Sequence, residues 1–204
     1  VREQRPFVLL KMAMTLDGRI ATAGGESKWI TGTKARHRVQ RLRQWADAIM
    51  VGAETVRQDN PSLTVRSPRN WPNQPEKLIW TRSGALDPDG NAFATTTAPP
   101  RMVSAQTPAE WNTLLANLGR RNITALLLEG GGELAASALQ AGAIDKIAFF
   151  MAPCILGGRD SRPVVSGENP TSLQDAFRFQ KVKWERVGND FLITGYCKHV
   201  YGLD

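Results

Sequence analysis

A glycine-rich stretch at residues 129–135 (EGGGELA) has the composition that points most directly to ligand chemistry. Gly130, Gly132 and Ala135 fit the spacing G-x-G-x-x-A, between an apolar run and a helical pattern. A loop of this kind brings backbone N–H groups and a helix N-terminus close to a phosphate. The same composition also suits a tight turn that needs glycine for positive φ, so the motif alone leaves both interpretations open.

The setting of this loop argues against a standard Rossmann domain. The loop lies late in the chain, and the next apolar run ends in FFMAP, without the acid that would hold an NAD ribose. Arg159 and Arg162 follow soon afterwards. If a dinucleotide binds, these basic residues favour one with a 2′-phosphate.

Lys11 lies inside the apolar run FVLLKMAM and shares a strand face with Leu9 and Ala13. A lysine in such a run must be paired, emerge at the end of the sheet, or carry a large desolvation cost. Ligands of α/β sheets bind outside the carboxyl ends of strands, and Lys11 lies toward that end. We therefore expect either a functional lysine or a strand-edge lysine with solvent access.

A run of basic residues occupies the helical pattern that begins at Thr33, a potential N-cap. It contains no acid, and its basic members are Lys34, Arg36, Arg38, Arg41 and Arg43. The run is compatible with a solvated helix face, with binding of a substrate phosphate, or with binding of nucleic acid. The net charge of +7 favours anionic partners without choosing among them. The aromatic side chains that single-strand binders place between basic residues are few here.

Metal-binding and membrane-spanning patterns are absent from the sequence. His37 and His199 are the only histidines, and neither His-x-Glu nor Cys-x-x-Cys occurs, so we expect no metal site. Cys154 and Cys197 are interpreted as buried free thiols in a reducing compartment. No apolar run approaches the roughly 18 residues of a membrane helix, and the first residues lack a secretory signal pattern.

Apolar runs alternate with amphipathic patterns along most of the chain. They predict strands at 7–14, 47–53, 77–81, 101–105, 123–131 and 145–153, and helices from 33, at 108–119 and at 133–142. From residue 177 the alternation changes to that of a long antiparallel hairpin that turns at 188–190. Residues 82–100 predict a surface loop. The order indicates one α/β domain with a mixed sheet and a C-terminal antiparallel hairpin.

The segment DNPSLTVR, residues 59–66, combines turn and strand signals. An extended residue is expected before Pro61, and a short strand is expected at 63–65. Taken alone, the segment fits a turn that leads into an edge strand.

Five segments occur here in a telling order: RPFVLLKMAMTLDGRIAT, GESKWITG, DAIMVGAETVRQDNPSLTVR, LLLEGGGELA and APCILGG. Through them the chain resembles the reductase domain of the bacterial riboflavin-biosynthesis deaminase–reductase, a dihydrofolate-reductase-like family. The resemblance implies a mixed, mostly parallel sheet flanked by helices, in a single reductase domain over residues 1–204. The N-terminal zinc deaminase domain of the family is absent and the sequence begins without Met, so we expect the deaminase on a parent chain or on a separate chain.

The resemblance also implies a reaction. It is the NADPH-dependent reduction of 5-amino-6-(5-phosphoribosylamino)uracil to the phosphoribitylamino compound, with hydride delivered to ribose C1′. The alternatives are a reductase of the 2,5-diamino-6-ribosylamino-pyrimidinone phosphate and, from another class, a basic nucleic-acid-binding module. The family reading implies a phosphorylated ribosylaminopyrimidine substrate, a homodimer, a cytoplasmic location, and neither nucleic acid nor membrane as partner.

Carried over position by position, the resemblance implies three sets of site residues. The NADPH-binding set is Ala13, Trp29, Thr55, Asp59, Gly131, Gly132, Glu133, Leu134, Ala135, Ala136 and Ser137. The substrate-binding set is Ser27, Arg43, Leu63, Arg66 and Glu129. The catalytic candidates are Lys11, Asp59 and Glu129.

Each residue type in these sets suits its task. Arg43 and Arg66 can hold a phosphate bidentately, and Glu129 can accept hydrogen bonds from sugar or pyrimidine groups. Lys11 or Asp59 can assist proton transfer. One departure is Arg82, which stands where the family often has Ser or Thr beside the cofactor and which can instead approach its 2′-phosphate.

Overall fold

An eight-stranded sheet organises the protein. The computed structural model describes residues 4–81, 86, 90–93 and 98–197, so Arg82 and His199 lie outside the described part. The strand order is β5-β4-β3-β6-β1-β7-β10-β9. The six strands from β5 to β7 pair in parallel, whereas β10 runs antiparallel to β7 and to β9. The predicted α/β architecture with a mostly parallel sheet and a C-terminal hairpin is confirmed.

The elements alternate along the chain as βα units. The strands of the large sheet are β1 (Phe7–Met14), β3 (Ala48–Gly52), β4 (Glu76–Trp80), β5 (Arg101–Val103), β6 (Ala125–Glu129), β7 (Lys146–Met151), β9 (Phe179–Val187) and β10 (Asp190–Cys197). The helices are α1 (Thr33–Trp45), α2 (Ala53–Asp59), α3 (Pro108–Arg120) and α4 (Gly132–Gln140), with a 3₁₀ turn at Leu173–Asp175.

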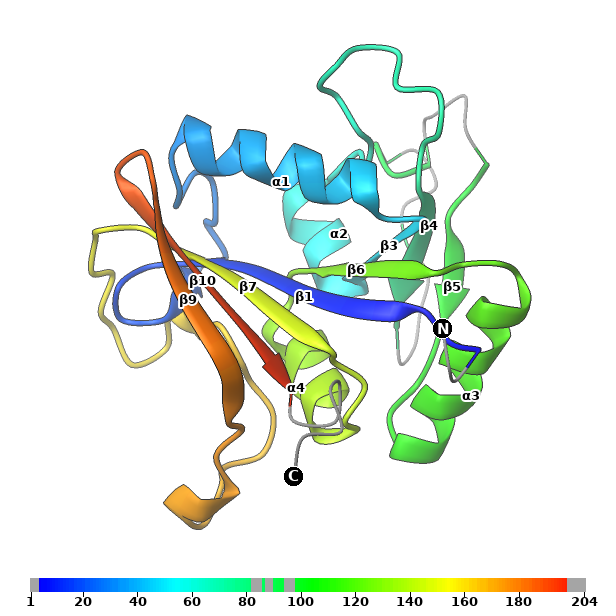
Figure 1. Ribbon diagram of the computed structural model, residues 1–204. Coiled ribbons are helices and arrows are strands. Elements are labelled where there is room, and N and C mark those ends of the chain that lie inside the picture. Colours follow the sequence, from blue (N-terminus) through cyan, green and yellow to red (C-terminus); the bar gives the residue numbers. More distant parts are fainter. Residues whose placement is uncertain (1–3, 82–85, 87–89, 94–97, 198–204) are drawn as a thin grey trace.

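Helices cover both faces of the sheet, as Figure 1 shows. On one face, Ala35 of α1 and Val56 of α2 pack in one apolar cluster with the sheet. On the other face, Trp111 of α3 and Leu134 of α4 belong to a second cluster. The central strands β3 and β6 are buried throughout, because each of their faces lies against helices. This burial explains why these strands consist of nearly unbroken apolar runs.

Three short elements were not predicted. The helix α2 follows β3 directly, and a small second sheet pairs β2 (Arg19–Ala21) with β8 (Arg162–Pro163). Residues 19–21 were assigned to a glycine-rich loop and the other two segments to no element, because seven residues or fewer carry too little periodicity to stand out. The small sheet brings residues 19–21 and 162–163 together, which are remote in the sequence.

Several local predictions are wrong. Gly32, not Thr33, is the N-cap of α1, and no side chain caps it; Thr33 is the first helical residue. The expected strand at 63–65 does not form, and Asn60 is left-handed (φ 43°) rather than extended. Cys154 and Cys197 are free as expected, but neither is buried: Cys154 is exposed and Cys197 is partly exposed.

The C-terminal hairpin also positions the loop at residues 22–32, near the other end of the chain. Asp190, which begins β10, is buried, and its carboxylate accepts a hydrogen bond of 2.8 Å from the N–H of Gly32. This contact fixes the start of α1 and the end of the loop at residues 22–32. The loop carries Ser27 and Trp29, two of the predicted site residues.

Candidate functional site

A cavity of about 1060 Å³ opens at the carboxyl ends of the parallel strands. Glu129 closes β6, Gly52 closes β3 and Trp80 closes β4, and all three line the cavity. Ligands of α/β sheets bind at this edge. The remaining walls come from the loop at 25–31, from α1 and α2, from the segment at 60–66, and from the glycine loop before α4.

The floor of the cavity is a cluster of three charged side chains: Lys11, Arg43 and Glu129. Lys11 of β1 is the register partner of Glu129 of β6, so both side chains leave the sheet on the same face. Arg43 of α1 holds Glu129 bidentately, with Nε and Nη2 2.7 and 2.8 Å from its two carboxylate oxygens. Both side chains of this pair are nine-tenths buried or more.

Burial and charge set the protonation of this floor. Burial alone would raise the pKa of Glu129, but the charge and hydrogen bonds of Arg43, with the charges of Lys11 and Arg66, hold that pKa below its ordinary value. Burial lowers the pKa of Lys11; the charge of Glu129 opposes this shift, and that of Arg43 adds to it. The pKa of Arg43 is raised, because Glu129 outweighs the effect of burial. The floor thus holds an ionised carboxylate beside a lysine that releases its proton more readily than usual.

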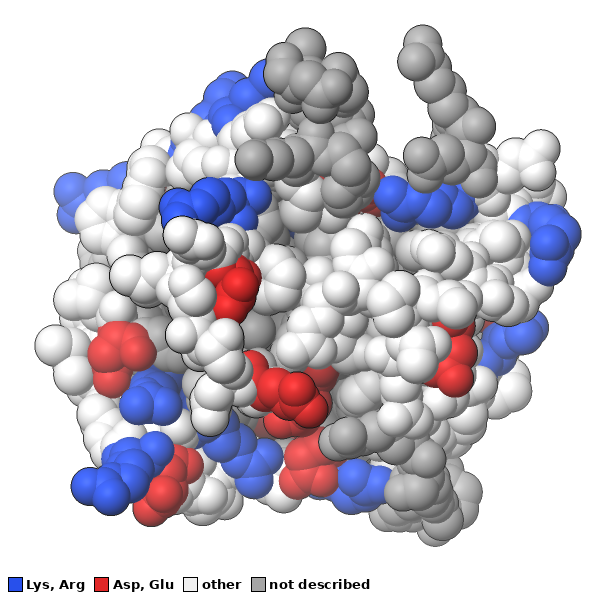
Figure 2. Space-filling model, turned by 90° about the horizontal axis from the view of Figure 1, so that it is seen from below, with Lys and Arg blue, Asp and Glu red and all other residues white. Residues whose placement is uncertain are grey.

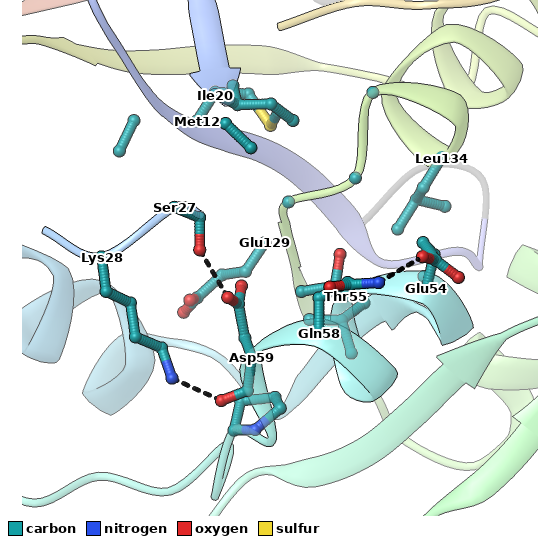
Figure 3. Close-up of a pocket in the computed structure, with 18 of the residues that line it drawn as sticks. Met12, Ile20, Ser27, Lys28, Glu54, Thr55, Gln58, Asp59, Glu129 and Leu134 are labelled. Atoms are coloured by element: carbon teal, nitrogen blue, oxygen red, sulfur yellow. Dashed lines mark hydrogen bonds between the residues drawn. The ribbon is translucent and has the colours of Figure 1, made fainter. Parts of the chain in front are cut away.

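Asp59, at the last position of α2, forms the opposite wall. Its carboxylate accepts a 2.5 Å hydrogen bond from the Ser27 hydroxyl, and its backbone carbonyl accepts one of 2.5 Å from Lys28 Nζ. Figure 3 shows both contacts joining the loop to the helix end. An acid at a helix C-terminus opposes the helix dipole, so helix stability does not explain this carboxylate, whereas the ammonium of Lys28 suits the position.

The glycine loop reaches the cavity through backbone geometry. Gly130 and Gly131 have φ of 81° and 92°, which glycine adopts without strain. A Cβ on Gly132 would lie 2.8 Å from the carbonyl oxygen of Pro163, so a side chain does not fit there. Gly131 is the N-cap of α4 and has no side-chain cap, and the first N–H groups of a helix lack intrahelical partners. The tight turn and the phosphate-approach interpretations are therefore compatible with each other.

Most predicted site residues meet at this cavity. Those that line it are Lys11, Ala13, Ser27, Trp29, Arg43, Thr55, Asp59, Leu63, Arg66, Glu129, Gly131, Gly132, Glu133 and Leu134. Trp29 is 66% exposed, and the guanidinium of Arg36 lies 4.7 Å from the centre of its ring. The cavity thus combines a charged floor with an exposed aromatic side chain on its wall.

Three residues of the predicted cofactor set do not line the cavity. Ala135 and Ala136 are buried, and the Ser137 hydroxyl accepts a hydrogen bond of 3.0 Å from Trp111 Nε1 of α3. Ala135 packs in the apolar cluster between the sheet and the helices α3 and α4, whereas Ser137 is only partly buried. Arg43 lines the cavity, but Glu129 and the carbonyl of Thr64 already occupy three of its five N–H groups.

Other cavity residues were missed by sequence reasoning. Asn91 donates through its N–H to the side-chain oxygen of Asn60 (2.6 Å) and through Nδ2 to the carbonyl of Asn60 (3.0 Å), which braces the end of α2. Arg162, by contrast, was singled out from the sequence for a cofactor phosphate; it lines the cavity, and its Nη1 lies 3.7 Å from Glu54 Oε1, a contact that the sequence did not predict. No sequence pattern connects positions so far apart, so only the fold reveals these contacts.

The basic residues of α1 do not form one surface. Arg36 stacks on Trp29, Arg38 pairs with Glu185 of β9 at 3.3 Å, and Arg43 is buried against Glu129. Figure 2 shows the side of the molecule away from α1, which lies at the top of Figure 1; on that side too, Lys and Arg side chains are interspersed with Asp and Glu. A phosphate-tracking face needs clustered cations, so this arrangement disfavours nucleic-acid binding.

Metal and membrane features are absent from the described residues. Within 4–81, 86, 90–93 and 98–197, no group of three or more His, Cys, Asp or Glu side chains could hold a metal ion. Over the same part of the chain, no helix has the length and apolar character to cross a membrane.

Comparison with known proteins gives matches along nearly the whole chain. The family model described as the RibD C-terminal domain matches residues 6–193. The riboflavin biosynthesis protein RibD of Actinobacillus pleuropneumoniae is 34% identical over 217 residues, which cover 95% of this chain and 57% of that protein. The 2,5-diamino-6-ribosylamino-4(3H)-pyrimidinone 5′-phosphate reductase of Methanothermobacter thermautotrophicus is 36% identical over 210 residues, covering 93% of this chain and 97% of that protein.

A solved structure agrees with these matches. The diaminohydroxyphosphoribosylaminopyrimidine deaminase/5-amino-6-(5-phosphoribosylamino)uracil reductase of Thermotoga maritima is 32% identical, with a TM-score of 0.82. The similarity covers 97% of this chain and 58% of that one. The chain thus spans little more than half the length of such two-function relatives.

Proposed function

We propose a function from the premise that this chain belongs to the RibD C-terminal domain family. The chain reduces 5-amino-6-(5-phosphoribosylamino)uracil to 5-amino-6-(5-phosphoribitylamino)uracil with NADPH, as a step of riboflavin biosynthesis. The observation that carries the proposal is the floor beneath a cavity of about 1060 Å³, where the buried pair of Arg43 and Glu129 lies beside the partly buried Lys11. Small-molecule and cofactor sites of proteins reach this size, on the order of 1,000 Å³.

The glycine loop and its neighbours fit a dinucleotide. The turn depends on glycine at both positions, because a Cβ would lie 3.3 Å from Thr55 Oγ1 at Gly131 and 2.8 Å from the Pro163 carbonyl oxygen at Gly132. Backbone N–H groups at the start of α4 would hold a pyrophosphate, and Thr55 and Trp29 line the same cavity. When bound, NADPH supplies the hydride from nicotinamide C4.

The protein's own contribution is orientation and proton transfer. Hydride addition to C1′ of the open-chain imine needs one proton on the imine nitrogen, so that the C=N bond becomes CH–NH. Lys11 is one candidate donor, because burial lowers its pKa and eases loss of its proton. Asp59, held by Ser27, is the other. Glu129, kept ionised by Arg43, would accept hydrogen bonds from the sugar or the pyrimidine.

The test of this function is a direct assay. The protein is mixed with NADPH and the deaminated phosphoribosylaminopyrimidine, and the nicotinamide absorbance is followed. We expect a decrease that depends on both the protein and the pyrimidine. A rate equal to the protein-free background would overturn the proposal.

A second substrate is favoured by one relative. The Methanothermobacter protein, which this chain covers almost completely, is named for reduction of the 2,5-diamino-pyrimidinone phosphate. Competition between the two pyrimidines in one assay separates the readings, because the preferred substrate has the higher kcat/KM. The nucleic-acid alternative predicts a mobility shift of unrelated duplexes that weakens steeply with salt.

The proposed partners are a second copy of the chain and a deaminase domain, on a parent chain or on a separate one. The Thermotoga protein, whose name combines a deaminase and a reductase, and the Actinobacillus RibD both extend well beyond the matched region. Solution mass measurement tests the homodimer: a mass near that of one 22.4 kDa chain at micromolar concentration would contradict it.

A further inference from the structure

The segment at residues 60–66 adopts a conformation that its own residues do not prefer. Asn60 and Leu63 both have positive φ, 43° and 53°. Positive φ is uncommon for leucine, and such a backbone persists only where its surroundings impose it. Leu63 is 1% exposed and packs in the apolar cluster beneath α1 and α2. The segment is therefore held from outside, and the contacts that hold it decide where Arg66 lies.

Gln74 supplies two of these contacts, one to each of the two peptide groups that flank Val65. Its Oε1 accepts a 2.8 Å hydrogen bond from the Val65 N–H, and its Nε2 donates to the Val65 carbonyl at 3.1 Å. The same Nε2 donates to the carbonyl of Trp71 at 3.2 Å, which fixes the amide of Gln74 itself. One side chain thus replaces the strand partner that Val65 lacks.

The two neighbours of Val65 are held in the same manner from α1. Arg43 Nη1 donates to the Thr64 carbonyl at 2.9 Å, and Gln40 Oε1 accepts from the Arg66 N–H at 2.7 Å. Three consecutive residues are thus fixed by three side chains and not by a β-ladder. This explains why a sequence with strand propensity forms no strand here.

Arg66 is the residue whose placement depends on these contacts. It lines the cavity, its side chain is exposed, and its charge contributes to the lowered pKa of Glu129 on the floor. Gln74 is not among the residues that line the cavity. It can therefore influence a ligand only through the backbone it holds.

We propose that Gln74 is a positioning residue for the phosphate-binding Arg66, acting through the peptide groups of Val65. The ligand class is a sugar phosphate monoester, whose dianion a guanidinium recognises bidentately. The inference rests on the proposed function and deepens it. It assigns a role in substrate binding to a side chain outside the cavity.

The kinetic test uses Gln74→Ala in the full chain. Loss of the two Val65 hydrogen bonds is expected to raise the substrate KM roughly tenfold, while kcat and the NADPH KM change less than about twofold. Gln74→Glu keeps the acceptor for the Val65 N–H but loses the bonds donated to the carbonyls of Val65 and Trp71. Its substrate KM should therefore lie between those of the wild type and Gln74→Ala. Gln106→Ala, an exposed substitution before α3, is the matched control.

A double-mutant cycle separates positioning from general support of the fold. If Gln74 acts through Arg66, Gln74→Ala in an Arg66→Ala background adds little, because the positioned group is already gone. A residue that only supports the structure would add its full effect in both backgrounds. Additive effects, or equal increases of the substrate and NADPH KM values, would overturn the inference while leaving the proposed function standing.

A binding measurement covers the case in which the wild-type chain reduces neither pyrimidine. Ribose 5-phosphate is titrated into the wild type and into Gln74→Ala by calorimetry. Binding that weakens roughly tenfold in the variant supports the positioning role independently of catalysis. Equal binding to both proteins, or none to the wild type, would overturn it. Circular dichroism of each variant confirms that the comparison is made between folded proteins.

Discussion

The floor and the rim of the cavity are built by different means. The floor residues Lys11, Arg43 and Glu129 stand on β1, α1 and β6, are largely shielded from water, and interact through charge. The rim at 27–29 and 59–66 is irregular backbone or a helix end, held by hydrogen bonds from side chains. Substitutions in the floor should therefore affect stability and chemistry together, whereas those in the rim should affect ligand handling with little cost in stability.

The largest effect is expected from Glu129→Ala in the floor. The substitution leaves the guanidinium of Arg43 buried without its carboxylate, and breaking a buried pair costs about 3–5 kcal/mol of unfolding free energy. Urea denaturation measures the change. Glu185→Ala is the matched control, because its pair with Arg38 is exposed and contributes only about 0–1 kcal/mol. Equal losses in the two variants would show that burial adds nothing to the floor pair beyond what an exposed ion pair contributes.

Asp59→Ala tests the rim at its most chemical residue. We expect the reductase rate to fall by more than about tenfold, since general acid–base groups contribute at least this much. The unfolding free energy should change by less than about 1 kcal/mol, because Asp59 is only partly buried and ends its helix against the dipole. Asp160→Ala, an exposed acid outside the cavity, is the control. Kinetics like those of the wild type would reduce Asp59 to a turn residue.

Arg66→Ala should affect binding of the pyrimidine substrate more than binding of NADPH. The substrate KM is expected to rise more than the NADPH KM, because the guanidinium would contact only the ribose phosphate. Steady-state kinetics with each ligand varied in turn measure both constants. Arg69→Ala, three residues later, exposed and not among the cavity-lining residues, should leave both values unchanged. Parallel increases in the two KM values would contradict the phosphate role.

The sequence predicted the sheet strands that carry the floor better than it predicted the irregular rim. The ends of the parallel strands were predicted to within one or two residues, and both ends of β1 were predicted without error. These predictions succeed because a strand buried on both faces must be apolar along its length. The rim gave the errors. At 63–65 the β-branched and apolar residues favour a strand, but no strand edge is paired with them, and Gln74, Gln40 and Arg43 take the backbone groups instead.

The site was predictable only in part, for a related reason. The glycine loop and Lys11 stand out within their own segments, since a glycine cluster and a lysine among apolar residues are local anomalies. The pairing of Arg43 with Glu129 joins positions 86 residues apart, and the brace between Asn91 and Asn60 spans 31. Such contacts depend on the packing of α1 over β6 and of one loop on another, which no local pattern contains. Resemblance to a family brought Arg43 into the site but gave no information on its pairing with Glu129.

The smallest expected effect is a change in pH dependence, and it tests the floor through Lys11. Burial lowers the Lys11 pKa in the folded state below its ordinary value of 10.5, which the unfolded chain retains. Between the lowered pKa and 10.5, the unfolded chain binds more protons at this position than the folded protein. The contribution of Lys11 to stability therefore increases as the pH rises through that window, and the cost of burying its charge is fully present below it.

Lys11→Met isolates this contribution, because methionine has a similar length and no charge, and Glu129 keeps its pair with Arg43. The unfolding free energy of the variant minus that of the wild type should be largest at the acidic end of the window and should shrink as the pH approaches 10.5. Urea titrations at matched pH values measure this difference, with Lys183→Met on the exposed strand β9 as the control for loss of one positive charge. A difference that stays constant or grows with pH would show that the folded protein accommodates the charged lysine, and the floor would then owe its protonation to ion pairing and not to burial.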